Sequence, residues 1–204
     1  AAIIAAVKFG KRASGFKGVA RAMGVAFIDC AARAIRTSVF EDDEQLSTLE
    51  SLICQQGTRE CVLPAELGAA DQAKLADLFE MCEVPVSTAR PNAFSARDAA
   101  QDLRRLLGGE PKELHGRHAE TSLAIDACAG LISYLGLMAQ PETHGQWALE
   151  WVDPAHFMRL DAGAMRALSL EPVPGEASKA SLLGIVSQCK TLMGGRLVRR
   201  WLRQ

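Results

Sequence analysis

Residues 184–191, with the sequence GIVSQCKT, come close to the Walker A pattern G-x-x-x-x-G-K-T of nucleotide-binding loops. The segment departs from the pattern at Cys189, which stands where the second glycine belongs. That glycine lets the backbone turn its N–H groups toward phosphate oxygens. The surrounding apolar residues recur at helical spacing, and no strand is expected before them. We therefore expect a helix that ends near Lys190, with Thr191 capping the next helix, and no nucleotide site.

Carboxylates that could hold catalytic metal ions are sparse in the apolar segments. A two-metal nuclease needs several of them close together at the sheet. Residues 2–9, the first expected strand, contain none, and Asp29 at the end of the second expected strand is the only well-placed strand acid. An aspartate alone at a strand end typically stabilises a turn. A metal-dependent nuclease stays an alternative that a cluster of three or more carboxylates would revive.

The four histidines and six cysteines show no spacing typical of a metal site. His115 and His118 are three residues apart in a polar stretch, but a tetrahedral zinc site needs two more ligands, and no cysteine is near them in sequence. No cysteine pair has C-x-x-C spacing, and most cysteines lie in apolar runs. We expect solvated histidines and free thiols in a reducing compartment. The sequence thus predicts no catalytic residue, cofactor ligand or metal ligand.

Four arginines near the end of the chain have the i, i+3, i+4, i+7 spacing of one helical face: Arg196, Arg199, Arg200 and Arg203. Apolar residues recur on another face: Leu182, Leu183, Val186, Cys189, Met193, Leu197 and Trp201. The cationic face either is solvated and paired with acids elsewhere in the protein, or binds DNA phosphates in a salt-dependent, sequence-blind way. We favour the interdomain contact and keep a small DNA-binding module as an alternative.

Composition limits the classes of protein that fit. The chain has 204 residues, a hydrophobic fraction of 49% and a formal net charge of −1, so it can bury a core and is not a polycation made for nucleic acid. Aromatic residues make up 5%, which argues against a base-stacking platform. No signal peptide and no apolar run long enough for a membrane span are visible. We expect one domain or one and a half, with no membrane partner.

Hydrophobic periodicity predicts an α/β fold with a mixed sheet. Three leading strands suggest an antiparallel meander, and the strands that then alternate with helices suggest parallel crossovers. The expected strands are 2–9, 24–30, 34–40, 60–63, 84–88 and 146–152. The expected helices are 46–57 (capped by Asp42 or Asp43), 71–82, 99–107 (capped by Ser95) and 120–138. The expected loops are 10–18, 110–117 and 141–145, and composition shifts at Asp153.

The end of the chain resembles the MutS family of DNA mismatch-repair proteins. One shared pattern, M-x-LD-x-x-x-x-RAL-x-L, is carried by Met158, Leu160, Asp161, Arg166, Ala167, Leu168 and Leu170. A second, CKT-x-x-G-x-RL-x-x-x-W, is carried by Cys189, Lys190, Thr191, Gly194, Arg196, Leu197 and Trp201. The segments RECVLP (59–64), LRRLLGG (103–109) and HGQWALEW (144–151) look like the eukaryotic MutS-homologue-two group of that family.

The resemblance implies a fragment: a ribonuclease-H-like connector domain over residues 1–152, then the helical start of the core/lever domain over 153–204. It implies a non-catalytic piece without the mismatch-binding, clamp and ATPase domains, so ATP and Mg²⁺ would belong to the full-length protein. The implied role is to link mismatch binding to the ATPase, with a hinge near 141–154 and Trp201 as a packing anchor.

The partners that the resemblance implies are a second MutS homologue in a heterodimer, mismatched duplex DNA through the full-length protein, and a MutL-type protein and an exonuclease that dock on this part. The implied location is the nucleus.

Overall fold

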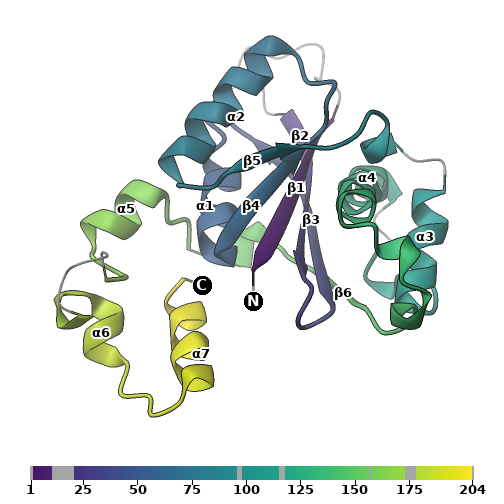
Figure 1. Cartoon of the computed structure of the whole chain (residues 1–204). Coiled ribbons are helices and arrows are strands. Elements are labelled where there is room, and N and C mark those ends of the chain that lie inside the picture. The colour runs from purple at the N-terminus through teal and green to yellow at the C-terminus, as the bar shows by residue number, and fades with distance from the viewer. Residues whose placement is uncertain are drawn as a thin grey trace.

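The computed structural model describes residues 2–10, 21–95, 98–114, 118–156, 158–172 and 178–203. Its centre is a six-stranded mixed sheet with the order β5-β4-β1-β2-β3-β6 (Figure 1). The strands are β1 (Ile3–Phe9), β2 (Arg21–Asp29), β3 (Ala34–Asp42), β4 (Thr58–Leu63), β5 (Val86–Thr88) and β6 (Ala148–Trp151). Each expected strand is present, and the α/β prediction is confirmed.

The sheet combines the two kinds of pairing that the sequence predicts. Strands β1, β2 and β3 form an antiparallel meander. Strand β4 pairs in parallel with β1 and β5 with β4, while β6 adds in parallel to the outer edge of β3. A meander extended by parallel strands is the ribonuclease-H-like arrangement expected for the connector domain.

Helices cover both faces of the sheet. Helices α1 (Ser47–Gln56) and α2 (Ala69–Met81) lie on one face, and α3 (Ala99–Leu107) and α4 (His118–Leu135) on the other (Figure 1). The strands serve both layers because successive side chains point to opposite faces. In β1, Ala5 and Val7 join the core beneath α1 and α2, whereas Ala6 joins the core beneath α3 and α4.

Two glycines allow helix α4 to lie close to its neighbours. A Cβ atom at Gly24 in β2 would lie 2.3 Å from the backbone oxygen of Leu123. A Cβ atom at Gly130 would lie 2.6 Å from the ring of Phe94. Glycine at these positions therefore lets the backbone of α4 approach β2 and lets the Phe94 ring pack directly on the helix.

Two aspartates that precede helix α1 bind the backbone of its first turn. Asp42, only 2% exposed, accepts hydrogen bonds from the backbone N–H groups of Thr48 (3.0 Å) and Leu49 (2.8 Å). Asp43 Oδ1 accepts from the N–H of Ser47 at 3.1 Å. Both residues that we considered as caps thus bind the first turn. The helix ends at Gly57, whose φ of 66° is the left-handed conformation that glycine favours.

The cap expected at Ser95 is wrong. Residues Ala93–Ser95 form a separate 3₁₀ turn, η1, and α3 begins at Ala99 after Asp98. The burial of Phe94 against α4 explains the difference, because it holds this turn apart from the helix that follows. The predicted end of α3 is confirmed: Gly108, at φ 71°, closes it.

Three short helices follow the sheet domain: α5 (Ala162–Ala167), α6 (Leu182–Val186) and α7 (Leu192–Leu202). The expected helix end near Lys190 is wrong, because α6 stops at Val186 and a non-helical segment follows. The expected cap of the next helix is confirmed: Thr191 Oγ1 accepts from the N–H of Gly194 at 3.1 Å. The remaining 3₁₀ turns are η2 (Lys112–Leu114), η3 (Leu137–Ala139), η4 (Pro141–Thr143), η5 (Pro154–His156) and η6 (Ser178–Ala180).

Of the expected loops, residues 11–18 and 115–117 lie outside the described residues, while Lys112–Leu114 form the turn η2. Helix α4 ends at Leu135 and not at 138, since Gly136 adopts φ 62° and opens η3. Across the described part of the chain, none of the helices combines the length and apolarity that crossing a membrane requires.

Candidate functional site at the junction of the sheet domain and the C-terminal helices

The C-terminal helices α5–α7 lie to one side of the sheet, with α5 near α1 (Figure 1). Two hydrogen bonds join the start of this segment to the sheet domain. Glu50 on α1 accepts from the N–H of Ala162 at 3.0 Å. Gln55, also on α1, donates its side-chain amide to the carbonyl of Met158 at 2.5 Å. The start of the segment is therefore held to α1 by two single polar contacts.

Arg166 of α5 adds a contact to the neighbouring helix. Its Nη1 donates to the carbonyl of Met81, the last residue of α2, at 3.2 Å. A helix leaves its last carbonyl groups without partners inside the helix, and a cation is a favourable partner for them. The C-terminal helices thus contact the sheet domain at the ends of α1 and α2.

Arg203, the last described residue, brings three segments together. Its Nε is paired with Glu171, and its Nη1 donates to the carbonyl of Cys54 at 3.4 Å. A Cβ atom at Gly57 would lie 2.2 Å from that Nη1, so the glycine that ends α1 also leaves room for the guanidinium. Arg203 therefore holds α7 against Glu171 and the end of α1.

The other three predicted site residues, Arg196, Arg199 and Arg200, lie near different parts of the protein. Arg199 Nε lies 3.6 Å from Glu171 Oε2 and shares that carboxylate with Arg203. Arg200 faces Arg36 of β3: burial lowers the pKa of Arg36, and the nearby positive charge of Arg200 lowers it further. Arg196 lines a cleft of about 490 Å³ between α6 and α7, together with Lys190 and Arg199. The structure thus brings two of the four arginines onto one acid and separates the other two.

Sequence reasoning missed the partners of this arginine face. Glu171 is 32 residues away from Arg203 in sequence, and Cys54, whose carbonyl also accepts from Arg203, is 149 residues away. The only signal was general: a partly apolar helix with a cationic face needs acids elsewhere. No spacing pattern in the sequence identifies which acids these are.

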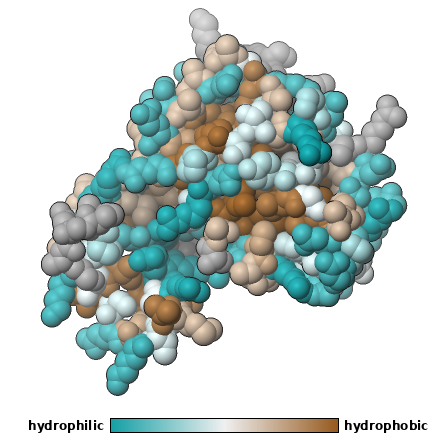
Figure 2. Space-filling model, viewed as in Figure 1, coloured by the Kyte–Doolittle hydropathy of each residue, from teal (hydrophilic) through white to brown (hydrophobic). Residues whose placement is uncertain are grey.

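Large apolar side chains of the C-terminal helices are exposed. Trp201, the expected packing anchor, is 63% exposed. Further large apolar side chains of the segment are also exposed to solvent: Met158, Leu168, Leu182, Ile185, Val186, Leu192, Met193 and Leu197. Hydrophobic patches are visible among the polar surface at the lower left of Figure 2, where these helices lie. Among the described residues of this segment, Ala162, Leu170 and Leu183 are the apolar side chains that are buried.

The residues weighed for catalysis take structural roles. Asp29 Oδ1 accepts from the N–H groups of Ala31 and Ala32, both at 3.0 Å, which confirms the turn prediction. In the Walker-like segment, Gly184 lies within α6 and Lys190 is exposed. No group of three or more His, Cys, Asp or Glu side chains suited to a metal ion occurs within the described ranges.

The histidines are scattered. His115 and the side chain of His118 lie outside the described residues. His156 is exposed in η5, with its Nε2 at 3.9 Å from Asp153.

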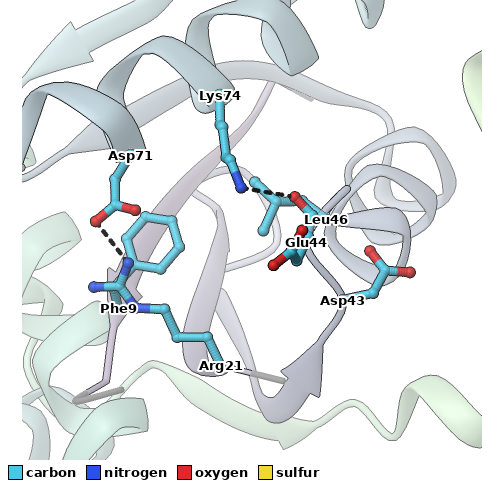
Figure 3. Close-up of a pocket in the computed structure, with 7 residues that line it drawn as sticks. All are labelled: Phe9, Arg21, Asp43, Glu44, Leu46, Asp71 and Lys74. Carbon is cyan, nitrogen blue, oxygen red and sulfur yellow. Dashed lines mark hydrogen bonds and ion pairs between the residues drawn. The ribbon is translucent and has the colours of Figure 1, made fainter. Parts of the chain in front are cut away.

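A second charged pocket of about 120 Å³ lies where β1, β2, α2 and the segment before α1 meet (Figure 3). Arg21 extends across it: its Nη1 is 2.6 Å from Asp71 Oδ2, its Nε donates to the Gly10 carbonyl at 3.2 Å, and its guanidinium stacks 4.2 Å from the centre of the Phe9 ring. Lys74 donates to the Glu44 carbonyl at 3.3 Å. Because these cations are already paired with the protein, the pocket fits a structural corner better than a ligand site.

Residues 145–152, which were expected to contain much of the hinge, are fixed to the sheet domain. The N–H of Gly145 donates to the backbone carbonyl of Arg105 at 3.0 Å, and the N–H of Val152 donates to the backbone carbonyl of Thr37 at 2.9 Å. Between them, β6 pairs with β3, and Trp147 and Leu149 are buried. A hinge over this stretch would have to break the edge of the sheet, so that expectation is wrong for residues 145–152.

Comparison with known proteins gives one family. The family model for MutS domain II matches residues 2–145. The Neurospora crassa DNA mismatch repair protein msh-2 is 36% identical over 209 residues, covering 100% of this chain and 22% of that protein. MSH2 of Arabidopsis thaliana is 34% identical (89% of this chain, 20% of that protein), and MSH2 of Saccharomyces cerevisiae is 31% identical (89% and 21%).

The chain thus spans about a fifth of the length of these relatives. MutS domain II is a non-catalytic connector domain, which overturns the nuclease alternative on this fold. The sheet order, the matched model and the relatives together show that the chain belongs to the MutS family, as a domain II of the eukaryotic MSH2 type followed by further helices.

Proposed function

We propose that this chain acts in DNA mismatch repair as a mechanical link. Residues 1–152 would form the connector domain, and residues 153–204 would begin the core/lever region that leads to the ATPase of the whole protein. The observation that carries the proposal is the polar junction: Glu50, Gln55 and Arg203 each make a single hydrogen bond across it. Small polar interfaces between domains permit relative motion, whereas large apolar ones prevent it.

The hinge of this link would lie at residues 153–156, between β6 and the first contact of the C-terminal segment with α1 at Met158. Among the described residues between β6 and α5, Val152 is the last whose N–H donates to the sheet. After it, η5 is a single turn held by Asp153, whose carbonyl and carboxylate accept from His156 and Ala155. A short turn between two hydrogen-bonded bodies absorbs changes in φ and ψ at low cost.

Amide hydrogen exchange tests the hinge. We expect the amides of Ala155 and His156 to exchange much faster than those of β3 and β6, because local opening there breaks few hydrogen bonds. Exchange of these amides as slow as that of β3 would contradict a hinge at this place.

The exposed apolar face of the C-terminal helices supports the same proposal. Trp201, Leu192 and Met193 of α7 are 63%, 82% and 79% exposed, and large apolar side chains exposed on one helix are typical of an interaction surface. We infer that further parts of the core/lever region cover it in the whole protein, with Trp201 as the packing anchor. On this account the MSH2-type protein works in the nucleus as a heterodimer with a second MutS homologue and holds mismatched DNA through other domains, while ATP and Mg²⁺ bind elsewhere in it.

The connector would also offer a docking surface for a MutL-type protein and an exonuclease. The test is a titration of the purified chain with each of them. Saturable binding that is absent for an unrelated protein of similar charge would support docking on this part of the protein, and failure to bind either would contradict it.

A DNA-binding role of the arginine face is the second candidate. Arg196 and Lys190 favour it, because both lie in the open cleft between α6 and α7. The engagement of Arg199 and Arg203 with Glu171 speaks against it, since a phosphate would have to replace that carboxylate. DNA binding that weakens steeply with salt and disappears when Arg199 and Arg200 become alanine would support this candidate.

A further inference from the structure

Two cysteines from different helices meet at the junction. Cys54 lies in the last turn of α1, and Cys82 directly follows α2. Their sulfur atoms are 3.9 Å apart, within hydrogen-bond distance for thiols, although the residues are 28 positions apart in sequence. A disulfide needs the sulfurs at about 2.05 Å. Formation of a disulfide would therefore require the two side chains to rotate toward each other.

The other four cysteines lie in different environments. Cys61 and Cys128 are fully buried in the two cores, and burial raises the pKa of both thiols, that of Cys128 to about 12. Cys30 and Cys189 are exposed. Cys54 and Cys82 are half-buried, so a small molecule in solvent can reach them while the protein still holds them together. The pair therefore combines proximity with access.

The hydrogen bond between the two thiols favours reaction at Cys54. The hydrogen bond from Cys82 lowers the pKa of Cys54; burial and the carboxylates of Glu50 and Asp161 oppose this, while the guanidinium of Arg203 assists it. The same hydrogen bond, with burial, raises the pKa of Cys82. A thiol with a lowered pKa is the better nucleophile at neutral pH, and its protonated neighbour is placed to resolve the product.

We propose that Cys54 and Cys82 form a reversible oxidation site, at which a hydroperoxide converts the two thiols into a disulfide that ties the end of α1 to the end of α2. In the first step the Cys54 thiolate attacks one peroxide oxygen. An S–O bond forms, the O–O bond breaks, and the leaving hydroxide takes up a proton to become water. In the second step Cys82 attacks the sulfenic sulfur, the S–S bond forms, the S–O bond breaks, and a second water leaves. With hydrogen peroxide, two thiols and one peroxide give one disulfide and two waters.

The position of the pair gives this oxidation a consequence. The carbonyl of Cys54 accepts from Arg203, and the carbonyl of Met81, beside Cys82, accepts from Arg166. These carbonyls are the points at which α7 and α5 contact the sheet domain. A disulfide would join the two contact points covalently and restrict their relative movement.

The test uses the whole chain in a background that carries Cys30→Ser and Cys189→Ser, which removes the exposed thiols. The protein is treated with hydrogen peroxide, its remaining thiols are alkylated, and it is digested without reduction for mass spectrometry. We expect a linked pair of peptides containing Cys54 and Cys82, an intact mass lower by two hydrogen atoms, and full reversal by dithiothreitol. The link should be lost in both Cys54→Ser and Cys82→Ser, with circular dichroism confirming that each variant is folded.

Two results would overturn the proposal. One is the accumulation of sulfinic acid on Cys54 while Cys82 stays alkylatable. The other is survival of both thiols under conditions that fully oxidise Cys30 in the unmodified chain. Neither outcome depends on whether Cys54→Ser and Cys82→Ser fold, because both outcomes are read on chains that keep Cys54 and Cys82.

Discussion

Replacing Arg203 by alanine should release helix α7 from the sheet domain. Arg203 is paired with Glu171 and donates to the carbonyl at the end of α1, and the two charged side chains are 20% and 25% exposed. Hydrogen bonds to charged groups contribute about 1.5–3 kcal/mol when shielded, whereas exposed ion pairs contribute about 0–1 kcal/mol. For this half-buried pair we expect a loss of about 1.5 kcal/mol in the free energy of local opening, which corresponds to roughly tenfold faster amide exchange.

The assay is hydrogen exchange followed by mass spectrometry on peptides that cover α7, with peptides of β2 as the internal reference. Arg196→Ala is the matched control, because Arg196 lies on the same helix and lines the open cleft without an ion pair to Glu171. Exchange in α7 should rise about tenfold in Arg203→Ala and stay unchanged in Arg196→Ala, while β2 is unaffected in both. Equal changes in the two variants, or none in either, would refute the role assigned to Arg203.

Three further changes test the fold that supports the junction. Asp42→Ala leaves the N–H groups of Thr48 and Leu49 without their partner and should lower the free energy of unfolding by about 2–4 kcal/mol. Urea unfolding measures the change, and Asp29→Ala, which affects only an exposed turn, is the control. Gly24→Ala places a methyl group against backbone of α4 and should cost about 2–3 kcal/mol in the same assay, whereas Gly109→Ala, with open space around it, should cost far less. Burial alone would raise the pKa of Asp43, but hydrogen bonds from Ser47, Gln45 and Leu46 lower it overall. The pKa of Asp43 is lower in the folded state, so the stabilisation that its carboxylate contributes is present above the unfolded pKa of about 3.9 and is lost as the pH falls through the folded pKa. The difference in urea midpoint between the wild type and Asp43→Asn should therefore shrink between about pH 6 and pH 3.

Much of the sheet domain could be predicted because its signals are local. The apolar run of residues 3–9, the glycines at 57 and 108 and the aspartates before α1 determine strands, helix ends and caps within a few residues of themselves. The error at Ser95 has a non-local cause. That residue belongs to a turn fixed by the burial of Phe94 against Gly130, which is far away in sequence.

The junction could not be predicted because its contacts have no periodicity. Helical spacing placed Arg199 and Arg203 on one face, but nothing near them indicates Glu171 or the carbonyl of Cys54 as their partners. The hinge was misplaced for the same reason. The turn residues between 141 and 145 suggest a flexible link, whereas the pairing of β6 with β3, which adds this segment to the sheet, depends on residues more than a hundred positions earlier.

A titration of the purified chain with mismatched duplex DNA, matched duplex DNA, ATP and a MutL-type protein tests the central claim most directly. A non-catalytic connector with a docking surface should bind the MutL-type protein and show no measurable affinity for ATP or for either duplex at physiological salt. Mismatch-selective DNA binding, or ATP binding, by this chain alone would contradict the account. It would then be the open cleft with Lys190 and Arg196, and not the polar junction, that explains what this part of the protein does.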